Sequence, residues 1–226
     1  MPHLVSTAAF RDALSYAVVA FSAIFFVVDP IAVVPVFITI TEGDSEDKRR
    51  AMARRACVIT AAILLTFMLC GGLIFQLFGL TLAAFRIAGG ILLMLTALDM
   101  LRSLPSRTRT SGQEMSEAAS KPDVAIVPLA MPLLAGPGSI ATVMVLVAQA
   151  KHAWQFGLLA LSILVTSVIS YLMLRAAGLV NRFLGNSGRA ILERVMGLLL
   201  VAIAVQFIIG GIHDGFPEIF QPDKAR

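Results

Sequence analysis

The sequence predicts an all-α integral membrane protein whose six transmembrane helices form two inverted three-helix repeats. Three observations predict this class: an apolar composition, six apolar segments of spanning length, and matching proline breaks in two of those segments. Hydrophobic residues make up 58% of the 226-residue chain and charged residues 14%, whereas an ordinary soluble domain has about 25% charged residues. We therefore expect one membrane domain over residues 1–226.

The six apolar segments are separated by short polar stretches. They cover about residues 13–41, 56–79, 82–101, 124–148, 154–174 and 191–212. Each has roughly the 20 residues that a helix needs to cross the hydrocarbon core. Residues 103–123 are polar and turn-prone, which predicts a flexible cytoplasmic linker between a first repeat, 13–101, and a second, 124–212. The charged loop before the second segment should be partly helical, since Glu46 and Arg50 have the spacing of a helical ion pair.

Matching positions in the two halves indicate the repeats. Pro30 and Pro137 are 107 residues apart, and Arg86 and Arg194 are 108 apart, each arginine followed three residues later by glycine. A repeat of three helices has an odd number of crossings, so the second copy must have the opposite orientation in the membrane.

Basic residues are sorted by side of the membrane. Thirteen of the eighteen Lys and Arg residues lie in or beside the loops after segments one, three and five: Lys48, Arg49, Arg50, Arg54, Arg55, Arg102, Arg107, Arg109, Lys121, Arg175, Arg182, Arg189 and Arg194. The positive-inside rule places these loops in the cytoplasm and both termini on the outer side of the membrane, which would be the periplasm in a bacterial inner membrane. This sorting accounts for the net charge of +4, and no nucleic-acid partner is expected.

Two breaks interrupt segments one and four near the middle of the bilayer. Asp is a favoured N-cap and Pro a favoured first helical residue, so Asp29-Pro30 predicts a new helix starting there. Gly136-Pro137-Gly138 predicts the same in segment four, which puts Ser139 in the first turn. Two helix N-termini that converge at mid-membrane favour an anion such as a carboxylate. The alternative is that both breaks are only kinks held by neighbouring helices.

Asp29 is the one acidic residue near the middle of an apolar segment, where a charge needs a partner or a cavity. Three roles remain open for it: helix cap, partner of a substrate ammonium group, and proton carrier. A fourth reading pairs Asp29 with Asp99 as an intramembrane aspartyl protease. The three histidines lie at loops or ends, so we expect no metal, haem or other cofactor.

The chain resembles the MarC family of bacterial inner-membrane proteins. The resemblance rests on VDP at 28–30, PVF at 35–37, FRIAGG at 85–90 and VPLAMPLLAGPG at 127–138. It implies six helices in inverted repeats, with helices 1 and 4 discontinuous and a substrate held between them. The sequence departs from many relatives at Ala32 and Val33, where they carry Gly and Asn, which predicts a smaller or drier first half of the site.

The resemblance also implies a function: secondary transport of small neutral amino acids, such as glycine or alanine, by alternating access, without enzymatic activity. The expected coupling ion is a proton, since no Walker motif indicates ATP. An exporter of amino acids or other small metabolites is the alternative. The expected substrate-binding residues are Asp29, Pro30, Ile31, Ala32, Gly136, Pro137, Gly138, Ser139 and Thr142.

Overall fold

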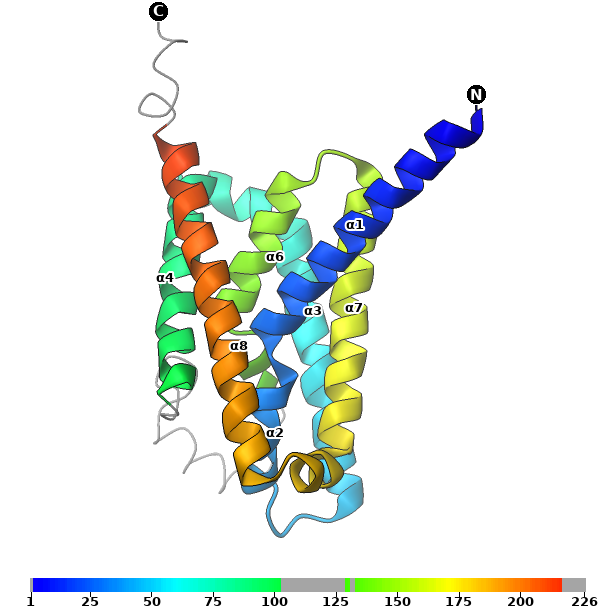
Figure 1. Ribbon diagram of the computed structural model, residues 1–226, viewed down its shortest axis with the longest axis vertical. Helices are drawn as coiled ribbons and strands as arrows, with labels where there is room; N and C mark the ends of the chain where they lie inside the picture. The colour runs from blue at the N-terminus through cyan, green and yellow to red at the C-terminus, as the bar shows by residue number, and fades with distance from the viewer. Residues whose placement is uncertain (1, 103–128, 131–132, 217–226) are drawn as a thin grey trace, which may run out of the picture.

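The computed structural model describes residues 2–102, 129–130 and 133–216, which form an elongated bundle of helices (Figure 1). Five segments among the described residues are long and apolar enough to cross a membrane: Phe10–Ile40, Glu46–Phe78, Leu82–Leu101, Ala153–Arg175 and Ala190–Gly215. The sixth expected crossing, 124–148, falls partly outside the described residues and contains a shorter apolar helix. The all-α prediction is confirmed over the described residues, which contain no strand.

The first half of the chain has four helices. α1 (Pro2–Val28) and α2 (Pro30–Ile40) are separated only at Asp29, so the predicted break in the first segment is confirmed. α3 (Glu46–Phe78) then returns along the bundle, and α4 (Leu82–Leu101) follows after a tight turn. α3 is longer than the apolar segment that predicted it, because the charged residues before that segment form its first turns.

Local signals explain where α3 and α4 begin and end. Ser45 caps α3 by accepting a hydrogen bond from the Lys48 amide, and the predicted pair of Arg50 and Glu46 forms at 2.7 Å. α3 ends at Gly79, whose φ of 61° is the left-handed conformation that favours glycine after a helix. The Thr81 hydroxyl then caps α4.

In the second half, the described residues before the second break, Leu129, Ala130, Leu133 and Leu134, have π-helical geometry. α6 (Pro137–Gln149), α7 (Ala153–Arg175) and α8 (Ala177–Gly215) follow.

The expectation of a loop between the last two segments is wrong, because α8 starts directly after α7. The first part of α8 lies across the lower end of the bundle in Figure 1 and turns upward at Gly185. This residue has φ 60° and ψ −176°, a backbone conformation that is essentially restricted to glycine. One glycine therefore allows a helix along the surface to continue into a helix through the bundle.

Each half-helix packs on helices from the other half of the chain. α2 contacts α7 and α8, whereas α6 contacts α3 and α4. The largest apolar core joins α1, α2 and the second break to α3 and α7, and contains Phe37, Leu64, Leu134, Leu159 and Ile163. The two halves are consequently interlocked and do not form separate lobes.

α4 and α8 make the most extensive contact between two helices of the bundle. A Cβ atom added to Gly90, Gly197 or Gly211 would lie 2.8 to 3.1 Å from a carbonyl oxygen of the partner helix. Small residues of this kind allow helix backbones to touch in a membrane, where apolar burial alone does not drive association. At the upper end of the pair, Arg86 of α4 forms an ion pair with Asp214 of α8.

Candidate functional site

The first break is built around Asp29. Its φ of 48° and ψ of 62° make it the only residue other than glycine with a positive φ in the described part of the chain. Asp and Asn are the side chains that best tolerate this conformation. The Asp29 carboxylate accepts a hydrogen bond from the Ala32 amide at 3.3 Å, and Pro30 occupies the first helical position. The predicted capping role of Asp29 is confirmed, and the residue is 2% exposed.

At the second break, one backbone amide and one side chain bind carbonyl groups of the residues that precede α6. The Ala135 amide reaches back five residues to the Ala130 carbonyl, and Gly136 then caps α6 in an extended conformation. The Ser139 hydroxyl donates to the Leu134 carbonyl at 3.0 Å. Because an apolar bundle offers no bulk water to these carbonyls, Ser139 holds the end of the π-helical turn to the start of α6.

The two breaks meet inside the bundle. In Figure 1, α2 runs from the break to the lower end and α6 runs from its break to the upper end. Gly138 lies against residues of α4 and α1: a Cβ atom added there would be 2.5 Å from Leu93 Cδ2 and 3.4 Å from Val27 Cγ1. The N-termini of the two half-helices therefore approach the middle of the bundle from opposite sides.

A cavity of about 20 Å³ lies at this meeting point. It is lined by Val27, Leu92, Leu93, Thr96, Leu133, Gly136, Pro137, Gly138 and Ser139. A single water needs roughly 10–15 Å³ measured in this way. The cavity can therefore hold about one water molecule and is too small for an amino acid.

The expected site residues divide into two groups. Four line the cavity: Gly136, Pro137, Gly138 and Ser139. Five do not: Asp29, Pro30, Ile31, Ala32 and Thr142. Of these, Ala32 packs against the same apolar cluster as Val27 and Leu93. Thr142 is fully buried, and its hydroxyl donates to the Gly138 carbonyl at 2.9 Å within α6. α4 contributes lining residues, including Thr96, that sequence analysis did not predict.

Two buried threonines differ from the buried serines of α7. Thr60 of α3 and Thr166 of α7 are each 1% exposed, and neither hydroxyl has a hydrogen-bond partner among the described residues. By contrast, Ser162, Ser167 and Ser170 of α7 all donate to the carbonyl four residues earlier. A buried hydroxyl without a partner costs stability, so these two are candidates for ligand contacts.

Helix geometry places Thr166 at the height of the first break. Phe37 of α2 and Leu174 of α7 line one pocket at the lower end of the bundle. Asp29 and Thr166 each precede these residues by eight positions, or about 12 Å of helix. Thr60 is 106 residues before Thr166, nearly the spacing of the two prolines. That spacing was the sequence signal that could have identified the two threonines as a related pair. Whether each hydroxyl donates within its own helix was not predictable from the sequence.

Comparison with known proteins agrees with the fold. The family described as MarC family integral membrane protein matches residues 14–216, which is most of the chain. The chain belongs to the MarC family. A UPF0056 membrane protein of Methanocaldococcus jannaschii is 45% identical over 200 residues, covering 88% of this chain and 97% of the relative. No solved structure matches the chain.

Bacterial relatives of this MarC family chain also match it over most of the length of both proteins. The UPF0056 membrane protein YvbG of Bacillus subtilis is 34% identical over 206 residues, covering 91% of this chain and 98% of YvbG. The UPF0056 membrane protein YhcE of Escherichia coli is 34% identical over 200 residues, covering 88% and 93%. The chain is therefore an integral multi-pass membrane protein, and these relatives' names state no substrate.

Proposed function

We propose that this MarC family protein is a secondary transporter of small neutral amino acids of the size of glycine or alanine, and not an enzyme. It would act by alternating access in the bacterial inner membrane, with both termini in the periplasm. The observation that carries the proposal is the pair of half-helices that start with proline inside the bundle and run to opposite ends. Transporters built from inverted repeats bind substrate at such discontinuous helices.

The packing pattern supports an inverted repeat with six crossings. α2 from the first half lies on α7 and α8, and α6 from the second half lies on α3 and α4. Exchanging the two halves converts one set of contacts into the other, as expected for a twofold relation between repeats.

The chemistry of the site favours a small zwitterion. The amide groups at the starts of α2 and α6 can bind a carboxylate, helped by the positive ends of both helix dipoles. The carboxylate of Asp29 and the hydroxyls of Thr60 and Thr166 are acceptors for an ammonium group. The tight contact of Gly138 with Leu93 leaves no room for a large side chain. The cavity must widen to admit substrate, which is the opening step of alternating access.

We further propose that a proton is the coupling ion and that Asp29 carries it. Asp29 is buried at the start of α2, between the two ends of the bundle. A carboxyl group in that position can take a proton from one side and release it to the other as access alternates. The same carboxylate caps α2, so protonation would also weaken the cap and change the stability of the break.

Uptake into proteoliposomes tests the proposal. Purified protein should accumulate labelled glycine or alanine when a pH gradient is imposed, and should not accumulate labelled phenylalanine. Gly138→Ala should lower uptake because its Cβ enters the cavity, whereas Gly72→Ala, a glycine with open space around it, should leave uptake unchanged. Preloaded liposomes measure efflux and distinguish an exporter. Absence of amino-acid movement in both directions, with and without a gradient, would reject the function.

A further inference from the structure

A second and larger cavity lies at the lower end of the bundle. Its volume is about 220 Å³, and it is enclosed by α2, the first turns of α3, the last turn of α7 and the start of α8. Its lining includes Phe37, Glu46, Arg49, Arg50, Arg175 and Leu179. We refer to it as the arginine pocket. It does not share a lining residue with the small cavity between the two breaks.

The arginine pocket carries excess positive charge. Arg50 is paired with Glu46 at 2.7 Å, so these two side chains largely neutralise each other. Arg49 and Arg175 have no carboxylate partner among the described residues. Guanidinium groups form paired hydrogen bonds with phosphate oxygens, and two of them at one cavity suit a phosphate group.

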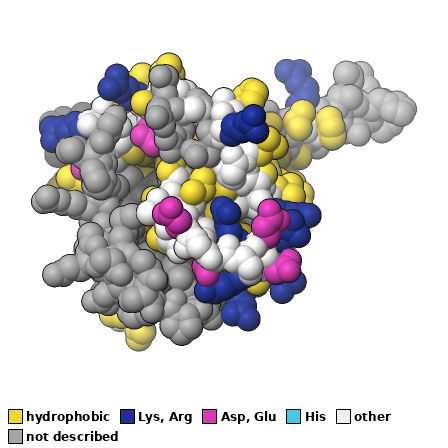
Figure 2. Space-filling view, turned by 90° about the horizontal axis from the view of Figure 1, so that it is seen from below, with side chains coloured by type: hydrophobic (Ala, Val, Ile, Leu, Met, Phe, Trp, Pro, Cys, Tyr) yellow, Lys and Arg dark blue, Asp and Glu magenta, His cyan; other side chains and the backbone are white. Residues whose placement is uncertain are grey.

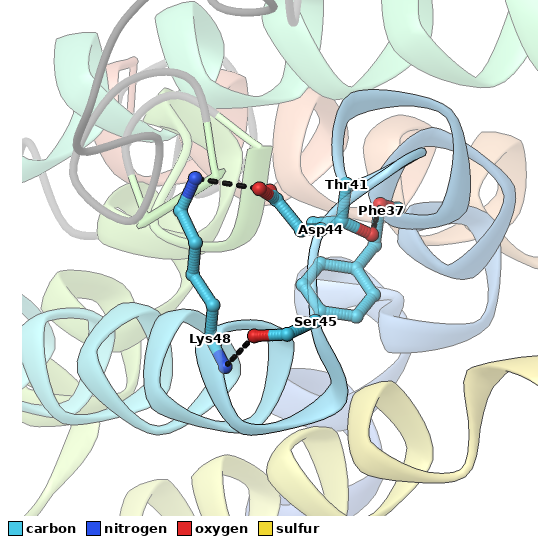
Figure 3. A network of polar contacts seen from close by, with 5 residues as sticks. All are labelled: Phe37, Thr41, Asp44, Ser45 and Lys48. Carbon is cyan, nitrogen blue, oxygen red and sulfur yellow. Dashed lines mark hydrogen bonds and ion pairs between the residues drawn. The ribbon is translucent and has the colours of Figure 1, made fainter.

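Side-chain contacts order the turn between α2 and α3, which directly precedes Arg49 in the chain (Figure 3). The Thr41 hydroxyl donates to the Phe37 carbonyl at 2.7 Å, which closes the last turn of α2. Asp44 pairs with Lys48 at 2.5 Å across the start of α3. Arg49, the next residue, lies over the Phe37 ring with Cζ 6.0 Å from the ring centroid. The guanidinium is thus positioned against a buried apolar wall.

Apolar side chains next to the pocket point to a lipid. Leu179 lines the pocket and is 71% exposed, and Phe183, one turn further along the same helix, is 89% exposed. This part of α8 lies across the end of the bundle (Figure 1). Figure 2 shows Lys and Arg side chains on the same end, interspersed with Asp and Glu side chains. A surface helix with exposed apolar residues beside basic groups is typical of the bilayer interface.

We propose that the arginine pocket binds the headgroup of an anionic phospholipid from the cytoplasmic leaflet. Arg49 and Arg175 bind the lipid phosphate, and the acyl chains lie along Leu179 and Phe183. The exposed apolar residues favour a lipid over a free phosphate, which would leave them in contact with water. Basic pockets between helices on the cytoplasmic side are suited to such headgroups. The proposal is independent of which solute the protein transports.

Lipid retention measures this binding. Protein extracted from bilayers with equal amounts of phosphatidylglycerol and phosphatidylcholine should retain phosphatidylglycerol preferentially, as counted by native mass spectrometry. The double variant Arg49→Gln/Arg175→Gln should lower this preference about 30-fold, since each basic group near an anionic surface contributes about five-fold. The matched control is Arg54→Gln/Arg102→Gln, which removes two exposed arginines at the same end but outside the pocket.

Three results would overturn the proposal. The first is equal retention of both lipids by the wild-type protein, a comparison that does not depend on any variant folding correctly. The second is a loss of preference in the control as large as in the pocket variant, which would indicate general surface charge. The third is thermal stabilisation of detergent-purified protein by inorganic phosphate as strong as that by phosphatidylglycerol, which would indicate a free-anion site.

Discussion

Substitutions of Asp29 can separate two properties of the first break: the side-chain cap of α2 and the left-handed backbone conformation. Asp29→Ala loses the hydrogen bond to the Ala32 amide, which costs about 1 kcal/mol for an N-cap. It also places alanine at φ 48°, which costs about 1 kcal/mol more. Asp29→Gly should cost only a few tenths of a kcal/mol, because glycine is a permissive cap without steric strain. Asp29→Asn retains both the acceptor and the tolerated conformation.

Thermal unfolding in detergent measures this series. A loss of about 2 kcal/mol lowers Tm by about 4–8 °C in a chain of this length, so Asp29→Ala should fall clearly below the other two variants. Asp12→Ala, an exposed acidic residue on α1, serves as the control for loss of charge. A Tm for Asp29→Gly as low as that of Asp29→Ala would refute the backbone argument. The same Asp29→Asn protein should transport without proton-driven accumulation if Asp29 carries the proton.

Three further predictions concern packing, the second break and topology. Gly90→Ala should destabilise the protein by about 1–3 kcal/mol in a denaturant titration, as overpacked sites do. Gly72→Ala, which meets no neighbour inside α3, should instead stabilise it by about 0.5–1 kcal/mol, the helix preference of alanine over glycine. Ser139→Val should lose about 1 kcal/mol of stability with its hydrogen bond to Leu134 and should transport more slowly; unchanged uptake would separate Ser139 from the site. A periplasm-dependent reporter fused after Arg226 should be active, and activity of a cytoplasmic reporter there would reverse the topology.

The breaks were predictable because their signals are local. Proline at a first helical position, with Asp29 or Gly136 before it, specifies a helix start without reference to the rest of the fold. The start of α3 was partly predictable for the same reason, from the spacing of Glu46 and Arg50. Local chemistry of this kind survives in the folded protein because neighbouring helices do not oppose it.

Features that depend on packing were not predictable. The first part of α8 has the mixed composition of a loop, yet it is helical and lies between the end of α7 and the bend at Gly185. Which hydroxyls donate within their own helix and which do not, as for Thr166, depends on the packing around each side chain. The contribution of α4 to the cavity between the breaks, through Leu93 and Thr96, likewise arises only when the halves interlock.

The glycine-mediated contact of α4 with α8 limits how the proposed transporter can move. One helix comes from each half of the chain, and a carbonyl oxygen lies within 3.1 Å of a Cβ position at Gly90, Gly197 and Gly211. Densely packed surfaces of this kind do not slide by small continuous steps. We therefore expect α4 and α8 to remain packed together as one rigid unit. Access of substrate to the site would then change when α2 and α6 move relative to this unit. The distance between a spectroscopic label on α4 and one on α8 should then stay constant throughout the transport cycle.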